Sequence, residues 1–288
     1  MSYKPTPKDI SELRARTSAG IGDCRAALDE AQGDMDKASE VLRKKGIAKA
    51  EKRAGRTVSQ GLVMIDLAAD GKSAGMVELN CETDFVAKTD DFIGLARDLA
   101  KQVATHAPVG VRAGSIDAQP FRGSTVAEAV KLMSGKTGEA MTINGFARFE
   151  QPNGLVASYL HHNSQVGVLV DIEGLAGDAL LALAKDIALH IASADPIGVT
   201  DTDIPAELIE RERRIAEEQV AAEGKPENIR AKIVDGKIRK FVAERVLTGQ
   251  PFVKDDKMTV GDLIAKQAKQ IGGAVVVKRF ARFKVGEA

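Results

Sequence analysis

The tetrapeptide Phe-Ala-Arg-Phe at residues 146–149 occurs again at residues 280–283. The two occurrences belong to a longer alignment without gaps, in which residues 124–150 match residues 258–284 and the dipeptide Thr-Val near the start is also repeated. Matching segments in a constant order indicate an internal repeat. We therefore expect two related halves in the main body of the chain.

The sequence pattern of each copy predicts a hairpin, a helix, a connection, a second helix and a final strand. Apolar residues alternate in the expected hairpins and follow helical spacing in the expected helices. Gly-Leu-Val begins the hairpin at residues 61–63 and again at 154–156. In the first helix, Leu-Ala-Arg-Asp-Leu-Ala at 95–100 corresponds to Leu-Ala-Lys-Asp-Ile-Ala at 183–188. A three-stranded antiparallel sheet with helices on one face would bury both patterns. The sequence thus predicts an α+β fold with a duplicated core.

The two copies differ in the length of two connections. If Gly75 corresponds to Gly167, the distance to the matching helix leucine is 20 residues in the first copy and 16 in the second. The first copy then has four extra residues in its strand-to-helix loop. Between the helix and the later Thr-Val, the first copy has 16 residues (109–124) and the second has 62 (197–258), which indicates an insertion of 46 residues.

The insertion is rich in charged residues, and Gly-Lys-Pro at residues 224–226 interrupts it. Apolar residues at helical spacing lie on both sides of the interruption: Leu208, Ile215, Ala222, Ile229, Ile233, Val234, Ile238 and Phe241. We predict an antiparallel hairpin of two helices over about 205–243, with a narrow apolar seam. The hairpin would serve either as a structural spacer or as a contact for a dimer or another partner.

Residues 6–46 predict three short helices that form a small bundle. The first is expected at residues 7–16, the second begins near Asp23 as a possible N-cap, and the third is capped by Asp34 and ends at Gly46. A basic stretch follows, and its cations are Lys44, Lys45, Lys49, Lys52, Arg53 and Arg56. This stretch is either a solvated linker helix or an arm that seeks phosphate.

These observations divide the chain into three expected parts: a three-helix domain with its linker at residues 1–56, core half one at 57–150, and core half two at 151–288. The 288 residues contain 41 Lys+Arg and 41 Asp+Glu, so no excess of positive charge favours direct nucleic-acid binding. Aromatic residues make up 4% and tryptophan is absent, so base-stacking surfaces are not expected. No apolar run approaches the length of a membrane span, and the charged N-terminus does not resemble a secretory signal.

The sequence contains no recognisable catalytic or metal-binding constellation. Gly135 and the two residues after it resemble a phosphate-binding loop, but that motif needs a glycine where Val130 stands. The adjacent His161 and His162 would point to opposite faces of a strand, and His190 has no obvious catalytic partner, so we expect it to be a partly exposed contact residue. The two cysteines, Cys24 and Cys81, are interpreted as buried thiols in a reducing cytoplasm. We therefore expect no enzyme, no metal and no cofactor, although an enzyme with a site scattered in sequence stays an alternative.

The longer strand-to-helix loop of the first copy is the strongest candidate site. It contains Thr83, Asp84, Phe85 and Val86, and an aromatic residue in a loop that the other copy shortens is not needed by the fold. Polar neighbours indicate that this loop lies on the surface. Two interpretations are open: Phe85 fills its own core, as phenylalanine usually does, or it projects as a wedge.

Four segments resemble the bacterial elongation factor Ts family. Leu-Arg-Ala-Arg-Thr-Ser-Ala-Gly at 13–20, with Asp-Cys at 23–24, is similar to its N-terminal signature. Glu-Leu-Asn-Cys-Glu-Thr-Asp-Phe-Val-Ala at 78–87 is similar to its second, long and specific signature. The segments at 247–253 and 282–287 resemble its C-terminal half. The resemblance covers essentially the whole chain, with small departures around Ser18 and at residues 25–26.

The resemblance implies a guanine-nucleotide exchange factor that promotes GDP release from elongation factor Tu. It implies that Asp84 and Phe85 form a wedge near the magnesium and phosphate site of that GTPase. By the same resemblance, the N-terminal domain of this chain would be similar to ubiquitin-associated domains and would contact the partner through Arg14 and Ile21. Partner contacts in the second half would come from three further residues, Val166, Gly167 and His190. The alternative from a different class is an adaptor that uses the three-helix domain to bind ubiquitin-like partners.

Overall fold

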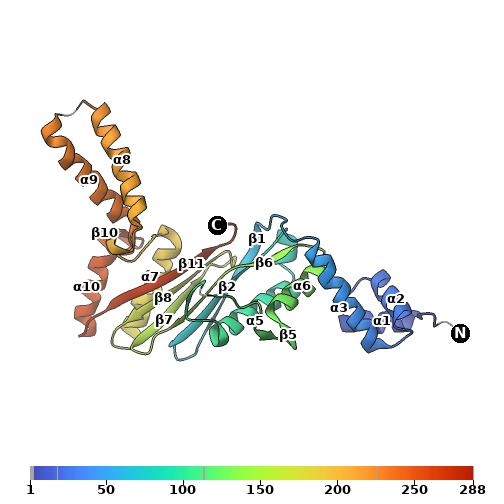
Figure 1. The fold of residues 1–288 in the computed structure, drawn as a ribbon. Helices are drawn as coiled ribbons and strands as arrows, with labels where there is room; N and C mark the ends of the chain where they lie inside the picture. Colours follow the sequence, from blue (N-terminus) through green and yellow to red (C-terminus); the bar gives the residue numbers. More distant parts are fainter. Residues whose placement is uncertain (1–2, 18, 113, 225, 288) are drawn as a thin grey trace.

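The computed structural model describes residues 3–17, 19–112, 114–224 and 226–287. Helices and antiparallel sheets alternate along the chain, so the predicted mixed fold with antiparallel sheets is confirmed. A bundle of three helices lies at one end, two sheets with their helices lie in the middle, and a long helical hairpin projects at the opposite end (Figure 1). Ser18 of the first signature, Lys225 in the expected hairpin turn and Ala288 lie outside the described residues.

The N-terminal bundle consists of α1 (Pro7–Thr17), α2 (Ile21–Glu30) and α3 (Met35–Glu51). Asp34 caps α3 as predicted, since its carboxylate accepts hydrogen bonds from the amides of residues 36 and 37 at 3.0 Å. Asp23 does not cap α2, which begins two residues earlier with Gly20 at the N-cap position. The bundle has a small core of its own, made by Leu13, Cys24, Ala27, Leu28 and Ala38.

The third helix does not end at Gly46 but continues to Glu51. The reason is a contact between two helices: α6 (Val126–Thr137), which belongs to the first half of the core, crosses α3. A Cβ atom at Gly135 would lie only 2.8 Å from the Cα of Gly46, so the two helix backbones touch at this pair of glycines. Gly46 therefore serves a close helix crossing rather than a helix end.

The first sheet has the strand order β1-β2-β6-β3 and is antiparallel throughout. It has four strands rather than the expected three, because a two-residue strand adds to one edge. The strands are β1 (Gln60–Leu67), β2 (Ser73–Cys81), β6 (Met141–Glu150) and β3 (Gly110–Val111). Helices α5 (Asp90–His106) and α6 cover one face of this sheet and bury Val77, Leu79 and Phe146 with it.

The second sheet has the order β11-β8-β7 and is also antiparallel. Its strands are β7 (Gly154–Leu160), β8 (Val166–Glu173) and β11 (Val276–Lys284). Helices α7 (Asp178–Ala194) and α10 (Val260–Ile271) cover one face and enclose a separate apolar core. Two small hairpins precede the second helix of each half: β4 (Pro120–Phe121) with β5 (Ser124–Thr125), and β9 (Pro251–Phe252) with β10 (Asp255–Thr259).

The two sheets pack against each other through the faces that the helices leave open. Val63, Met76 and Phe149 of the first sheet share a core with Leu169 and Phe283 of the second. The central strands β2 and β8 are consequently buried on both faces. This sheet-to-sheet contact was not predicted from the sequence.

The strand register corrects the alignment of the two halves by one residue. Phe146 pairs with Val77, and Phe280 pairs with Val170, so Val77 corresponds to Val170. By the same register Gly75 corresponds to Val168 and not to Gly167. Measured from the corresponding strand residues 77 and 170 to the helix leucines 95 and 183, the paths are 18 and 13 residues. The path between corresponding strand and helix residues is thus five residues longer in the first half. The connection itself, 82–89 against 174–177, is four residues longer, as predicted, because β2 continues one aligned position further than β8.

The helical hairpin consists of α8 (Ala206–Ala222) and α9 (Glu227–Arg245), close to the expected bounds. Its seam contains Ala216, Val220, Val234 and Ile238. On α8 the predicted seam was wrong in register, because Ile215 is exposed and Ala216 is buried instead. Short 3-10 turns at Asp201–Asp203 and Leu247–Gly249 flank the hairpin. Among the described helices, none combines the length and the apolar character that crossing a membrane requires.

Candidate functional site

The loop between β2 and α5 contains a single helical turn, α4 (Asp84–Ala87). Thr83 is its N-cap, and the Thr83 hydroxyl accepts a hydrogen bond from the amide of Val86. Val86 packs against the first core and Ala87 is buried, whereas Phe85 is 80% exposed. The turn is therefore anchored by two residues and presents the third to solvent. The interpretation in which Phe85 fills its own core is wrong.

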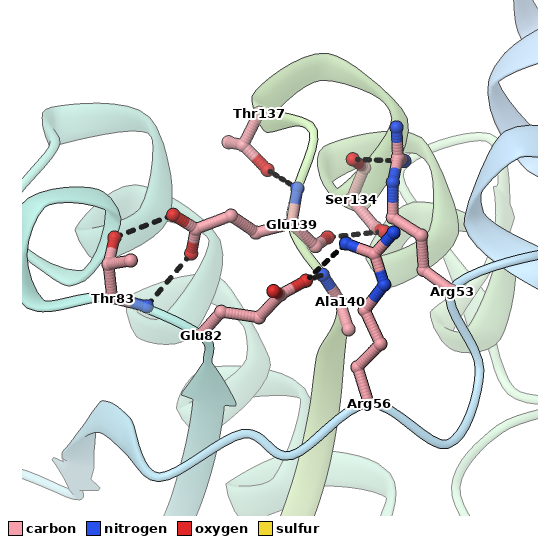
Figure 2. A network of polar contacts seen from close by, with 8 residues as sticks. All are labelled: Arg53, Arg56, Glu82, Thr83, Ser134, Thr137, Glu139 and Ala140. Atoms are coloured by element: carbon pink, nitrogen blue, oxygen red, sulfur yellow. Dashed lines mark hydrogen bonds and ion pairs between the residues drawn. The ribbon is translucent and has the colours of Figure 1, made fainter.

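This loop is joined to a second loop, between α6 and β6, by two carboxylates, one from each loop (Figure 2). Glu139 accepts hydrogen bonds from the amide of Thr83 at 3.0 Å and from the Thr83 hydroxyl at 2.6 Å. In return, Glu82 accepts a hydrogen bond from the amide of Ala140 at 2.6 Å. We call Glu82, Thr83, Glu139 and Ala140 the carboxylate clamp. The clamp joins two loops that are 56 residues apart in sequence.

The linker that follows α3 reaches the same network (Figure 2). Arg56 lies 3.3 Å from a carboxylate oxygen of Glu82, and Arg53 donates to the carbonyl of Ser134 at 3.2 Å. The Ser134 hydroxyl in turn donates to the carbonyl of Glu139. The Ala140 amide, together with Arg56, holds the pKa of Glu82 below its usual range. Two cations of the basic stretch therefore bind the carboxylate clamp and its surroundings, so they are engaged within the protein.

Asp84 begins the exposed turn and lies beside Phe85. Its carboxylate pairs with Lys88 at 2.5 Å, one helical turn further on. This hydrogen bond and the charge of Lys88 lower the pKa of Asp84, which is thus ionised at neutral pH. The turn accordingly presents an aromatic ring next to a carboxylate that a partner would meet at the surface.

Neither cysteine has the properties of a nucleophile. Burial raises the pKa of Cys81 to about 11, and it also raises the pKa of Cys24. A thiol with a raised pKa stays protonated and unreactive at neutral pH. Both cysteines are buried, in agreement with the interpretation from sequence.

The N-terminal candidates lie on the surface of the bundle. Ile21 is the first residue of α2 and is 61% exposed, which is unusual for an isoleucine. Arg14 is an exposed residue of α1. An apolar and a cationic side chain are thus available on the bundle, at the opposite end of the molecule from the helical hairpin (Figure 1).

The candidates in the second half lie deeper than expected. Val166 begins β8 and is half-buried. Gly167 is buried between the two sheets, where a Cβ atom would approach Val63 to 2.5 Å. Its lack of a side chain is explained by this internal contact, so Gly167 offers nothing to a partner at the surface.

His190 was expected to be partly exposed, and this expectation is wrong because the side chain is 1% exposed. Its Nδ1 accepts from the amide of Val253 at 3.2 Å, and its Nε2 lies 3.0 Å from the side-chain oxygen of Gln250. Gln250 then donates to the carbonyls of Ala194 and Glu244. Burial lowers the pKa of His190, which favours the neutral ring that this arrangement needs.

The first half contains the same arrangement without a histidine. Gln102 donates to the side-chain oxygen of Gln119, and Gln119 donates to the carbonyl of His106. Gln102 lies seven residues after the first-half helix leucine, and His190 lies seven after the corresponding leucine of the second. His190 therefore has a structural role: it fixes the small hairpin to the end of its helix.

The remaining features that resembled sites have structural explanations. In the segment that resembles a phosphate-binding loop, and that was rejected as one from the sequence, Gly135 touches Gly46 and Lys136 pairs with Asp91 at 2.7 Å. Within the described ranges, no group of three His, Cys, Asp or Glu residues is arranged to hold a metal ion.

Sequence reasoning missed Glu139, which carries half of the carboxylate clamp. A signal was present in the repeat itself, because the gapless alignment places Gly273 of the second copy at the position of Glu139. A long carboxylate in one copy and a glycine in the other mark a residue that the common fold does not need.

Comparisons with known proteins agree with the resemblance noted from sequence. The profile of the family described as Elongation factor TS matches residues 82–287. Proteins called Elongation factor Ts from Azoarcus and from Thioalkalivibrio sulfidiphilus are 48% and 44% identical, over 94% and 98% of this chain and 89% and 92% of their own lengths. The protein of the same name from Aquifex aeolicus is 42% identical over 97% of both chains. This chain belongs to the elongation factor Ts family of translation elongation factors.

Proposed function

We propose that this protein is a guanine-nucleotide exchange factor that promotes the release of GDP from elongation factor Tu. The observation that carries the proposal is the exposed Phe85 beside an ionised Asp84, on a turn that is held firmly by the carboxylate clamp. The turn lies in residues 78–87, the segment that resembles the second signature of the family. In this proposal it enters the partner near its magnesium and phosphate site.

The mechanism needs binding energy and no covalent chemistry. A GTPase holds its nucleotide through backbone amides of the phosphate loop and a magnesium ion. A factor that binds the nucleotide-free state more tightly weakens nucleotide binding by the same factor, because the two equilibria are linked. Burial of one phenylalanine contributes about 1.5–3 kcal/mol, or roughly ten- to 150-fold.

That contribution is modest for the displacement of a tightly held nucleotide, so the wedge needs support from further contacts. Ile21 and Arg14 of the bundle and Val166 at the start of β8 are the residues we assign to these contacts. Gly167 and His190 act from inside, by permitting the sheet contact and by holding the small hairpin. The protein is then a binding partner rather than an enzyme.

The test is the release of fluorescent GDP from purified elongation factor Tu, followed by stopped flow with and without this protein. We expect strong acceleration by the unmodified chain and a loss of at least tenfold with Phe85→Ala. Undiminished acceleration by a folded Phe85→Ala variant would overturn the wedge, and no acceleration by the unmodified chain would overturn the proposed function.

A further inference from the structure

In the carboxylate clamp, the glutamate of each loop accepts a hydrogen bond from a backbone amide of the other loop. Glu82 binds the amide of Ala140, and Glu139 binds the amide and hydroxyl of Thr83. Each loop thus supplies one carboxylate and receives one. Hydrogen bonds to ionised acceptors are the strong ones among protein hydrogen bonds. The relative position of residues 82–83 and 139–140 is therefore well determined.

The clamp determines where Phe85 points, because Thr83 is the N-cap of α4. A helix of four residues has almost no stability of its own, since the first turn fixes several residues for a single hydrogen bond. The turn must consequently be held from outside. Val86 and Ala87 hold its C-terminal side against the core, and Glu139 holds its N-terminal side through Thr83.

The second half shows that folding does not require this arrangement. Gly273 occupies the position of Glu139, and Leu175 of the short β8–α7 connection lies against it: a Cβ atom at Gly273 would be 3.0 Å from the Leu175 side chain. The corresponding strand and helix are present in both halves. The carboxylate of Glu139 thus serves the longer connection and its exposed turn.

We infer that Glu139 is a positioning residue for nucleotide exchange, which holds Thr83 so that Phe85 is already oriented toward the partner before the two proteins meet. The inference rests on the proposed function and adds a residue to it. A turn that is ordered in advance avoids the loss of conformational freedom on binding, and binding is then stronger for the same contacts. Glu139 itself acts through Thr83 and does not need to touch the partner.

Glu139→Gln in the full-length protein is the sharpest test. Glutamine keeps the size of the side chain but replaces one acceptor oxygen with an NH₂ group, and Thr83 offers two donors at this site. We expect the accelerated release of fluorescent GDP to fall about tenfold, the factor that corresponds to ~1.4 kcal/mol. The matched control is Glu150→Gln, at the other end of β6, where an exposed glutamate pairs with Arg148. We expect nucleotide exchange with this control to match the unmodified chain.

A double variant separates positioning from a general loss of structure. If Glu139 acts through the turn, Glu139→Gln has no further effect once Phe85→Ala is present, measured at a concentration where release still exceeds the spontaneous rate. An equal loss in both backgrounds would mean that Glu139 only supports the fold, and it would overturn the inference. Thr83→Ser, which keeps the hydroxyl, should preserve nucleotide exchange, whereas Thr83→Val should reproduce the loss.

Amide hydrogen exchange of Thr83 in the free protein gives a readout that is independent of the partner. We expect faster amide hydrogen exchange at Thr83 in Glu139→Gln and unchanged protection in the core strands. If Phe85→Ala abolishes nucleotide exchange while Glu139→Gln alters neither readout, the inference fails and the proposed function stands. If the unmodified chain does not accelerate GDP release, the proposed function fails and the inference fails with it.

Discussion

The β2–α5 and β8–α7 connections leave corresponding strands and enter corresponding helices, yet they differ in what they present to solvent. The first occupies residues 82–89 and includes α4, with Phe85 held out by the carboxylate clamp. The second occupies residues 174–177 and contains no helical turn; its Leu175 lies against Gly273 but is still 58% exposed. The second connection shows how few residues are sufficient to join strand and helix. The additional residues of the first connection are therefore free to serve recognition.

The largest effect should come from the central strands that these connections follow. A methyl group at Gly75 would lie 2.3 Å from the amide nitrogen of Ala104, a backbone atom fixed in α5. At Gly167 the closest atom is a side-chain carbon of Val63, which can move. We expect Gly75→Ala to lower the free energy of unfolding by about 3 kcal/mol or more, and Gly167→Ala by about 1 kcal/mol. Urea denaturation measures both, and equal losses would contradict the corrected register, which turns the two glycines to opposite faces.

The next prediction compares the exposed residues of the two connections. Phe85→Ala should reduce accelerated GDP release at least tenfold and change the free energy of unfolding by less than about 1 kcal/mol, as surface substitutions do. Leu175→Ala is the matched control in the second half, and we expect GDP release within about twofold of the unmodified chain. Asp84→Ala should also reduce the rate. A comparable loss with Leu175→Ala would show that both connections contact the partner.

A smaller effect should distinguish the two hydrogen-bonded hairpins, which use Gln102 in one half and His190 in the other. Because burial lowers the pKa of His190 in the folded state, the folded protein binds fewer protons here than the unfolded chain. The contribution of His190 to the free energy of unfolding is thus fully present above about pH 6.5, and it declines as the pH falls toward the lowered pKa. We expect His190→Gln to flatten the fall of the unfolding free energy below about pH 6.5. An unchanged pH profile would show that His190 is not a source of the decline.

The smallest change in stability should follow removal of the helical hairpin, which only the second half has. Replacement of residues 207–241 with a short flexible bridge leaves the carbonyls of Glu244 and Arg245 in place, to which Gln250 and Ile197 donate. The hairpin has a seam of its own, separate from the main cores. We expect a cooperative melt with a stability loss below about 1 kcal/mol, because the length of a surface connection costs little entropy, and only a partial loss of nucleotide exchange. Loss of the near-ultraviolet circular dichroism signal would show that the hairpin belongs to the core.

Helices and strands could be predicted from the sequence where a single hydrophobic periodicity dominates. Features that depend on contacts with residues distant in sequence were predicted less well. Hydrophobic spacing located the helices of both halves, and the exposed Phe85 could be singled out from the unequal loop lengths. The end of α3 could not be placed, because Gly46 is kept in the helix by its contact with Gly135, 89 residues away. The burial of His190 depends on Gln250 in the same way, since nothing in the local sequence reveals a partner 60 residues distant.

The crossing of α3 and α6 at Gly46 and Gly135 has a consequence for how the proposed contacts cooperate. Because the two backbones touch, α3 packs directly on α6, and the bundle that carries Ile21 is joined to the core by a continuous helix and not by a flexible linker. After this helix, Arg53 donates to the carbonyl of Ser134 in α6, and Arg56 pairs with Glu82 in the loop that carries Phe85. Once either Ile21 or Phe85 is seated on a partner, the other is presented at a high effective concentration. Two modest contacts that are rigidly connected then act as one bivalent interaction. Its affinity depends on the close helix crossing that the two glycines permit.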